Sequence, residues 1–285
     1  MDERGWHCPH CDVALITSSM DELRCRCGWG LHRKGRRWLM ERDMDPKGFD
    51  RAAVERLQLM ENHFWMRERR YLMDHLLRRL GTHGQQAAEL GCGTGSNLPL
   101  LEERFARVTA IDGYATLLER AERNSVKAEL LQADVCRSPL AGGIFELVMA
   151  MDVIEHVDPD GFLTEARRIA VPGGTLLLSA PAAPSLWSRM DEMAGHRCRY
   201  TRRQMEDELR RNGWIPAGFT HYQCLLFPLV WLSSKLGTRA DDKFERKPPA
   251  WLDRVLGGVS HLETTLCGGL PLPFGSSLIM WAKAG

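Results

Sequence analysis

The feature that most constrains the fold is a regular alternation of short apolar runs and helix-length segments beyond residue 84. Five runs are candidate strands: AAEL, VTAID, ELLQAD, FELVMAMD and GTLLLSAP. This alternation is typical of βαβ units, whose strands pair in parallel and whose helices cover both faces of the sheet. The sequence therefore predicts an α/β fold with a Rossmann-like, doubly wound sheet. Ligands of such sheets bind at the carboxyl ends of the strands.

Acidic residues stand where four of these candidate strands end. They are Glu89, Asp112, Asp134 and Asp152. The first strand continues into ELGCGTGSN, whose glycines at 91, 93 and 95 would let a ligand approach the backbone closely. Ser96 stands where a dinucleotide fingerprint needs its last glycine, so NAD is disfavoured. We expect Asp112 to accept hydrogen bonds from ribose hydroxyls and Asp134 to bond an adenine amino group.

The stretch MDVIEHVDPD, residues 151–160, permits two interpretations. If the chain turns helical after Asp152, then Asp152, Glu155 and His156 share one helix face and could hold a metal or a proton. Alternatively, Asp152 is an N-cap and Glu155 the partner acid of a capping-box-like start. The spacing by itself does not decide between these interpretations.

Four cysteines in the first 27 residues predict a zinc-binding module. Cys8 and Cys11 form CPHC, and Cys25 and Cys27 form CRCG, with thirteen residues between the pairs. Zinc takes four tetrahedral thiolate ligands and can stabilise a segment too short to build its own core. Because the second pair is CxC, a histidine at 7, 10 or 32 could replace Cys25. We interpret residues 1–42 as a zinc ribbon with a structural metal.

Composition limits the classes of partner. The net charge of +1 gives the chain no strong field for nucleic acid, although seven Lys or Arg stand between Arg24 and Arg42. No apolar leader or stretch of membrane-spanning length is present, and the cysteine usage suits a reducing compartment, so we expect a cytoplasmic protein. The apolar, Trp-rich tail beyond residue 220 is compatible with a peripheral membrane contact.

The motifs ELGCGTG, AIDG, QADV and FELVMAMDVIEHV resemble, in this order and spacing, those of class I S-adenosylmethionine (SAM)-dependent methyltransferases. The resemblance covers about residues 50–220. It implies that Glu89 bonds the methionine end of SAM, that the glycines at 91, 93 and 95 and Met151 line it, and that Asp112 and Asp134 hold ribose and adenine. On the basis of this resemblance, we interpret residues 43–84 as a linker and helical lid. Residues 85–285 are interpreted as the methyltransferase domain, with a C-terminal extension that shapes the substrate pocket.

The DVIEHV stretch is also similar to the ExxEH of ubiquinone-pathway and small-RNA methyltransferases. In the RNA enzymes that motif and a later histidine bind a divalent cation, which implies a possible Mg²⁺ at Asp152, Glu155, His156 and His196. Without metal, His156 or His196 could be the general base. The segment LWSRMDEMAGHRCRY resembles a subgroup of these enzymes, and its Trp187, Arg199 and Tyr200 could line an acceptor pocket.

The function that we expect is O-methylation of a small-molecule or lipid- or glycan-linked acceptor. The first alternative is an RNA methyltransferase that docks nucleic acid through the ribbon and the basic run Arg33 to Arg37. The second is a non-catalytic SAM-binding scaffold whose ribbon recruits a partner. The acceptor itself is not predicted.

Overall fold

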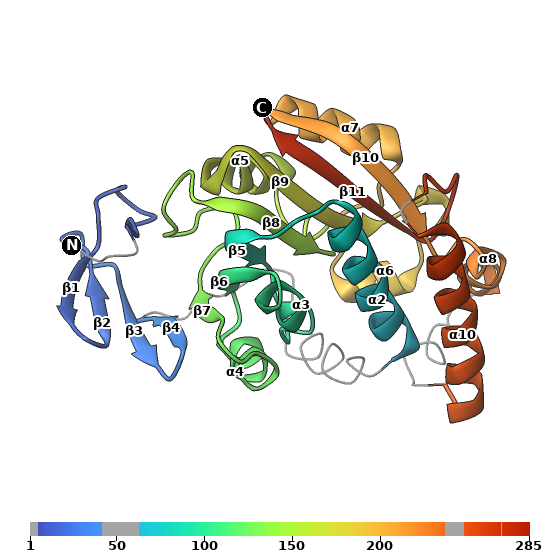
Figure 1. Cartoon of the computed structure of the whole chain (residues 1–285), viewed down its shortest axis with the longest axis horizontal. Helices are drawn as coiled ribbons and strands as arrows, with labels where there is room; N and C mark the ends of the chain where they lie inside the picture. Colours follow the sequence, from blue (N-terminus) through green and yellow to red (C-terminus); the bar gives the residue numbers. More distant parts are fainter. Residues whose placement is uncertain (1–4, 42–62, 237–247, 269) are drawn as a thin grey trace.

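The computed structural model describes residues 5–41, 63–236, 248–268 and 270–285. Its strands form one mixed sheet in the order β1-β2-β3-β4-β7-β6-β5-β8-β9-β11-β10 (Figure 1). None of the helices within these ranges is both long and apolar enough to span a membrane.

All five predicted strands are present and parallel, which confirms the predicted α/β class. They are β5 (Gly84–Leu90), β6 (Phe105–Asp112), β7 (Glu129–Gln132), β8 (Phe145–Met151) and β9 (Ala170–Pro181). Two further strands, β10 (Trp214–Tyr222) and β11 (Ser277–Ala284), extend the sheet beyond β9. Because β11 is antiparallel to both β9 and β10, β10 runs in the same direction as the five central strands.

Helices cover both faces of the sheet, as predicted for a doubly wound fold. One apolar cluster joins the sheet to α2 (Phe64–Arg79), α3 (Leu98–Glu102) and α4 (Ala115–Asn124). The other joins it to α5 (Pro159–Ile169) and α7 (Arg202–Arg211). The remaining helices are η1 (Pro184–Leu186), α6 (Arg189–Ala194), α8 (Phe227–Leu236) and α10 (Ala250–Cys267). Successive strand residues such as Ala87 and Ala88 belong to opposite clusters, because side chains alternate across a strand.

The N-terminal segment extends this sheet. Its strands β1 (Ile16–Ser19), β2 (Glu22–Arg24), β3 (Gly30–Lys34) and β4 (Arg37–Met40) form an antiparallel meander. Strand β4 then pairs in parallel with β7, and Trp38 stands opposite Leu131 (Figure 1). The cysteine spacing predicted the ribbon but gave no indication of this strand pairing.

Side chains of the basic run fasten the ribbon to α4. The Arg36 guanidinium donates to the backbone carbonyls of Glu122 and Ser125, at 2.5 and 2.7 Å. Arg37 is buried and forms an ion pair with Glu122 at 2.9 Å. Two arginines that the sequence suggested for nucleic acid thus bond within the fold.

The linker and helical lid predicted for residues 43–84 are described only from residue 63 onward. There α2 begins at Phe64, with His63 as N-cap, and ends at Arg79, two residues before Gly81, whose φ is +62°. Helix α2 packs against α10 at the far end of the molecule from the ribbon (Figure 1). The part of the prediction before residue 63 lies outside the described residues.

Replacing Trp38 by alanine should lower the free energy of unfolding by about 3–5 kcal/mol. Trp38 is 1% exposed and packs edge-on against Trp6, and its indole N–H donates to Glu129 Oε1 at 2.9 Å. The same substitution at Trp251, which is 66% exposed, should change the free energy by no more than about 0.5 kcal/mol. Urea unfolding of both variants measures the difference, and equal effects would show that Trp38 does not join the ribbon to the core.

Candidate functional site

The glycine-rich turn after β5 has a backbone that only glycine fits. Gly91 and Gly95 have φ of +71° and +77°, in the left-handed region. A Cβ on Gly91 would lie 2.5 Å from Val153 Cγ2, and one on Gly95 would lie 2.9 Å from the Cα of Ala121. Because Val153 belongs to the DVIEHV stretch, this contact places the turn after β8 directly against the glycine turn.

Glu89 offers a buried acceptor beside the glycine turn. Its side chain is 1% exposed, and Oε1 accepts a hydrogen bond from Asn97 Nδ2 at 2.8 Å. Its Oε2 is buried and has no hydrogen-bond partner in the described part of the chain. Burial raises the pKa of this carboxyl to about 8. Such a group fits a cationic ligand atom, because a positive charge would stabilise the carboxylate. Asn97, which fixes Glu89, was quoted in the sequence motif but given no role there.

Asp112 holds the turn from the neighbouring strand. Its Oδ2 accepts from the Gly93 amide at 2.8 Å, and its Oδ1 accepts from the Tyr114 amide at 2.9 Å. Burial raises the pKa of Asp112 to about 6, although these amide bonds act to lower it. Asp134 is exposed and caps the amide of Cys136, whereas Met151 packs in the core at 6% exposure. The hydrogen bonds of Glu89 and Asp112 thus bring both carboxylates to the glycine turn.

The turn after β8 corrects one interpretation of the sequence. Helix α5 begins only at Pro159, and its N-cap is Asp158, whose carboxylate accepts from the Gly161 amide at 2.8 Å. Asp152 instead has a φ of +55°, a left-handed conformation that aspartate tolerates better than most residues. The N-cap interpretation of Asp152 and the common helix face are both wrong, because a non-helical turn separates β8 from α5.

The Asp152 carboxylate is engaged by protein groups. Its Oδ1 accepts from the Ser179 hydroxyl at 2.7 Å, and its Oδ2 forms an ion pair with Arg69 of α2. Arg69 is buried at 6% exposure, and its guanidinium also lies over the Trp65 ring, 5.6 Å from the centroid. The sequence motifs gave no indication of a role for Arg69.

Glu155, His156 and His196 form a compact cluster. One potential ligand atom from each lies within 4.8 Å of the others, and the two imidazole centroids are 4.9 Å apart. Glu155 is fully buried, and neither carboxylate oxygen has a hydrogen-bond partner within the described ranges. Its pKa is raised well above the ordinary value, first by burial and then by the charge of Asp152. Burial and the nearby His196 lower the pKa of His156 to about 4, so His156 is neutral at pH 7.

Asp191 orients His196. This carboxylate is 1% exposed, and its Oδ1 lies 2.8 Å from both His196 Nδ1 and Arg199 Nε. Burial alone would raise its pKa, but the hydrogen bond from His196 and the charge of Arg199 bring the pKa below its usual value. An ionised Asp191 accepts a hydrogen bond from Nδ1–H, which leaves the Nε2 of a neutral His196 as the basic atom. Asp191 was quoted in the sequence segment but not identified as a site residue.

The other residues of that segment have different surroundings. Tyr200 is buried at 4% exposure, whereas Trp187 is 37% exposed. The Arg199 guanidinium bonds to Asp191 and to the carbonyl of Ala182.

The donor set at this cluster fits Mg²⁺ poorly. Mg²⁺ prefers an octahedron of oxygen atoms, whereas two imidazoles and one carboxylate are a set that transition metals favour. The fourth residue suggested by the sequence, Asp152, lies outside this group and is bound to Arg69 and Ser179. We therefore assign no chemical step to Mg²⁺.

The four predicted cysteines come together at the other end of the molecule. Cys8 Sγ lies 3.5 Å from Cys27 Sγ, and Cys11 Sγ lies 3.3 Å from Cys25 Sγ. All four sulfur atoms lie within 4.8 Å of one another. Tetrahedral zinc with Zn–S bonds of about 2.3 Å requires sulfur atoms about 3.8 Å apart. The cluster fits a closed structural zinc site, and Cys25 belongs to it without help from a histidine.

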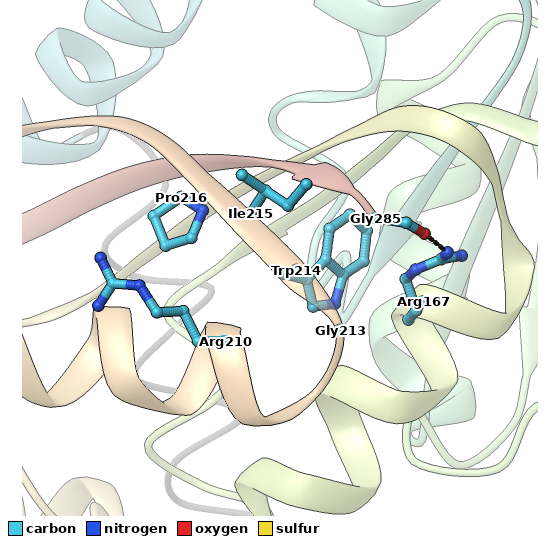
Figure 2. Close-up of a pocket in the computed structure, with 7 residues that line it drawn as sticks. All are labelled: Arg167, Arg210, Gly213, Trp214, Ile215, Pro216 and Gly285. Carbon is cyan, nitrogen blue, oxygen red and sulfur yellow. Dashed lines mark hydrogen bonds between the residues drawn. The ribbon is translucent and has the colours of Figure 1, made fainter.

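A separate surface pocket lies near the amino end of β10, away from the glycine turn. It has a volume of about 520 Å³, and Figure 2 shows its lining from β10, its neighbours and the C-terminal residue. Arg167 donates a hydrogen bond to the Gly285 carbonyl there. None of its lining residues is an acid or a nucleophile, so we do not place the chemistry in this pocket.

The chain is similar to known methyltransferases in sequence and in fold. Residues 88–178 match the family described as "Methyltransferase domain". A malonyl-[acyl-carrier protein] O-methyltransferase of Serratia marcescens is 31% identical over 38% of this chain and 45% of its own length. A ubiquinone biosynthesis O-methyltransferase of Pseudomonas aeruginosa is 27% identical over 46% of this chain and 62% of its own length. The chain spans about half the length of such relatives.

A solved structure shares the fold. Phosphoethanolamine N-methyltransferase 2 of Haemonchus contortus, in complex with SAM, aligns with 84% of this chain and 58% of its own, with a TM-score of 0.54 and 17% identity. This likeness establishes the Rossmann-like architecture and carries no information on the acceptor.

The cysteine cluster predicts that the purified protein holds one zinc ion per chain. Replacing Cys25 by serine should remove most of that zinc, because a hydroxyl is a much weaker zinc ligand than a thiolate. The matched control is Cys136→Ser, because Cys136 lies outside the cluster. Metal analysis after dialysis gives the stoichiometry. Zinc-free native protein, or equal zinc in both variants, would contradict the assignment.

Proposed function

We propose that this chain, a class I SAM-dependent methyltransferase by its matched domain and its fold, methylates a hydroxyl oxygen of a small-molecule or lipid- or glycan-linked acceptor. The observation that carries the proposal is the contact between the buried Asp191 carboxylate and His196. It lies in one cluster with the turn after β8, and that turn packs on the glycine turn through Val153.

The residues around the glycine turn suit the two ends of SAM. The unpartnered Glu89 Oε2 would accept a hydrogen bond from the ammonium group of the methionine moiety. Asp112 would accept from the ribose hydroxyls, and Asp134 would lie at the adenine edge. When bound, SAM supplies a methyl group made electrophilic by its sulfonium sulfur.

His196 would act as the general base. Its Nε2 would take the proton of the acceptor hydroxyl as that oxygen bonds to the methyl carbon, while the methyl–sulfur bond of SAM breaks and S-adenosylhomocysteine leaves. The imidazolium that results would be stabilised by ionised Asp191. Arg199 donates to the same Oδ1 atom of Asp191 and helps to keep the carboxylate in place. The neutral neighbour His156 adds no positive charge that would oppose protonation of His196.

The names of the relatives support oxygen as the acceptor atom. Both relatives described above are O-methyltransferases, one of a malonyl-[acyl-carrier protein] and one of ubiquinone biosynthesis. Nucleic acid is not favoured, because Arg36 and Arg37 of the basic run are bonded to α4. A non-catalytic scaffold gives no reason for the contact between buried Asp191 and His196.

Affinity for S-adenosylhomocysteine, which carries the same ammonium group, should rise with pH. Glu89 has a pKa of about 8 in the free chain, so it is largely protonated at neutral pH and must lose its proton to bind a cation. We expect a rise of up to about tenfold per pH unit below that pKa. In Glu89→Gln the rise should vanish and the affinity fall about tenfold.

Calorimetric titration at several pH values between about 6 and 8 measures both effects. Glu103→Gln is the matched control, because the Glu103 side chain is 65% exposed and should leave the profile unchanged. A native profile that is flat with pH would refute the role of Glu89.

Replacing His196 by alanine should slow methyl transfer by about 10²–10⁴-fold at saturating SAM, because the acceptor hydroxyl loses its base. Asp191→Asn should slow transfer in the same direction, because a neutral amide does not stabilise the imidazolium. The assay is the initial rate of transfer of radiolabelled methyl from SAM into a cell extract fractionated into lipid, small molecules and nucleic acid.

The control for this series is His83→Ala, because His83 is exposed and contacts only a local carbonyl, that of Gly81. Affinity for S-adenosylhomocysteine should be retained in all three variants. A His196→Ala rate within about twofold of the native rate would exclude His196 as the base, and label confined to nucleic acid would exclude the proposed acceptor class.

A further inference from the structure

A second group of buried polar side chains lies between α10 and the carboxyl end of β10. Four of its oxygen atoms are buried: Tyr222 Oη, Ser260 Oγ, Glu263 Oε1 and Thr264 Oγ1. Within the described residues, Glu263 Oε1 and Thr264 Oγ1 have no hydrogen-bond partner, and the Tyr222 and Ser260 hydroxyls have at most each other. Their residues are at most 4% exposed. An unmade hydrogen bond in the interior costs about 1–3 kcal/mol, so buried oxygen atoms with this much unused hydrogen-bonding capacity are unexpected unless a polar molecule binds there.

The geometry places this polar group at the ligand-binding edge of the sheet. Ser260, Glu263 and Thr264 are three and four positions apart on α10 and therefore share one face of the helix. Tyr222 is the last residue of β10, which runs parallel to β9. Its side chain thus lies at the same edge as Glu89 and the turn after β8. In Figure 1, α10 and α2 lie side by side at this edge.

Arg69 connects this polar group with the methyl-transfer site. The pKa of the Tyr222 hydroxyl is raised by burial and lowered by the neighbouring Ser260 hydroxyl, and the charges of Arg69 and Glu263 also act on it. The same Arg69 charge acts on Glu89, beside the glycine turn. The indole N–H of Trp65, on whose ring Arg69 lies, is buried and has no partner in the described part of the chain.

The charges around the polar group are already paired. Glu68 accepts from Arg67 at 3.0 Å and lies 3.1 Å from His261 Nδ1. Arg69 is paired with Asp152, and the second oxygen of Glu263 accepts from the Leu225 amide at 2.7 Å. The atoms that remain are three hydroxyls, one carboxylate oxygen and one indole N–H.

These atoms define the chemistry of a matching ligand. An anionic group would be repelled by the Glu263 carboxylate and would find no unpaired cation among the groups described above. A neutral group with several hydroxyls can donate to Glu263 and can both donate to and accept from Tyr222, Ser260 and Thr264. Sugars and other polyols have this character, and the indole ring of Trp65 offers them an apolar face.

We propose that Tyr222, Ser260, Glu263 and Thr264 form the acceptor subsite and bind a neutral, hydroxyl-rich group such as a sugar or polyol. This inference rests on the proposed function and specifies its acceptor class. The segment beyond residue 220 therefore supplies the polar lining of this acceptor subsite, from the buried side of α10.

The experiment uses the full chain, radiolabelled SAM and an extract of the cells that produce it. The labelled product is hydrolysed in acid and separated by ion exchange. We expect the label in the neutral fraction, as an O-methyl sugar or polyol. Label released as methanol, the product of a methyl ester, overturns the subsite and leaves O-methylation intact. Label in an amine or nucleic acid overturns both proposals, as does the absence of label in protein that binds S-adenosylhomocysteine.

A pair of variants tests the lining with the labelled acceptor. Thr264→Val removes one hydroxyl at nearly constant volume and should raise KM for the acceptor at least about fivefold with little change in kcat. Thr265→Val makes the same change at an exposed position of the same helix and should leave KM as it is. Affinity for S-adenosylhomocysteine should not change in either variant. Equal KM values for the two variants overturn the subsite, even where the labelled product is found in the neutral fraction.

Discussion

The ion pair between Arg69 and Asp152 is the interaction on which the candidate site depends. Both groups approach from different elements, α2 and the turn after β8, and the arginine is 6% exposed. A buried charge without a partner is strongly unfavourable, so the pair ties the position of that turn to the helix. The same guanidinium acts electrostatically on Glu89, Glu155 and Tyr222. One cation therefore stabilises an edge of the sheet at which several buried acids converge.

The ribbon is linked to the cofactor edge by hydrogen bonds as well as by strand pairing. The Met40 amide donates to the side chain of Gln132, which is 1% exposed, and Gln132 Nε2 donates to the Gly113 carbonyl at 3.1 Å. Gly113 directly follows Asp112, the residue proposed to hold ribose. A structural metal in the ribbon would thus support the loop beside the proposed ribose site from a distance.

Much of the fold was predictable because its signals are local. The five apolar runs, the glycine turn and the four cysteines each depend on residues within a short segment, and all are present as expected. The stretch after Asp152 was misinterpreted because helix spacing within six residues is a weak signal, whereas the conformation there is set by the ion pair with Arg69, 83 positions away. Asp191 and Asn97 stood in quoted segments without roles, because a buried carboxylate is recognised only by what surrounds it.

The sequence by itself determined the α/β class, the sheet edge that carries the acids and the cysteine pattern of a candidate zinc site, because each follows from spacing along the chain. Only the tertiary structure decided which charges meet. It joined the ribbon to β7, placed Arg69 against Asp152, and brought Glu155 and His156 beside His196. It also turned the polar face of α10 inward toward Tyr222. These contacts join residues far apart in the chain, and they depend on burial and charge compensation, which no local pattern encodes.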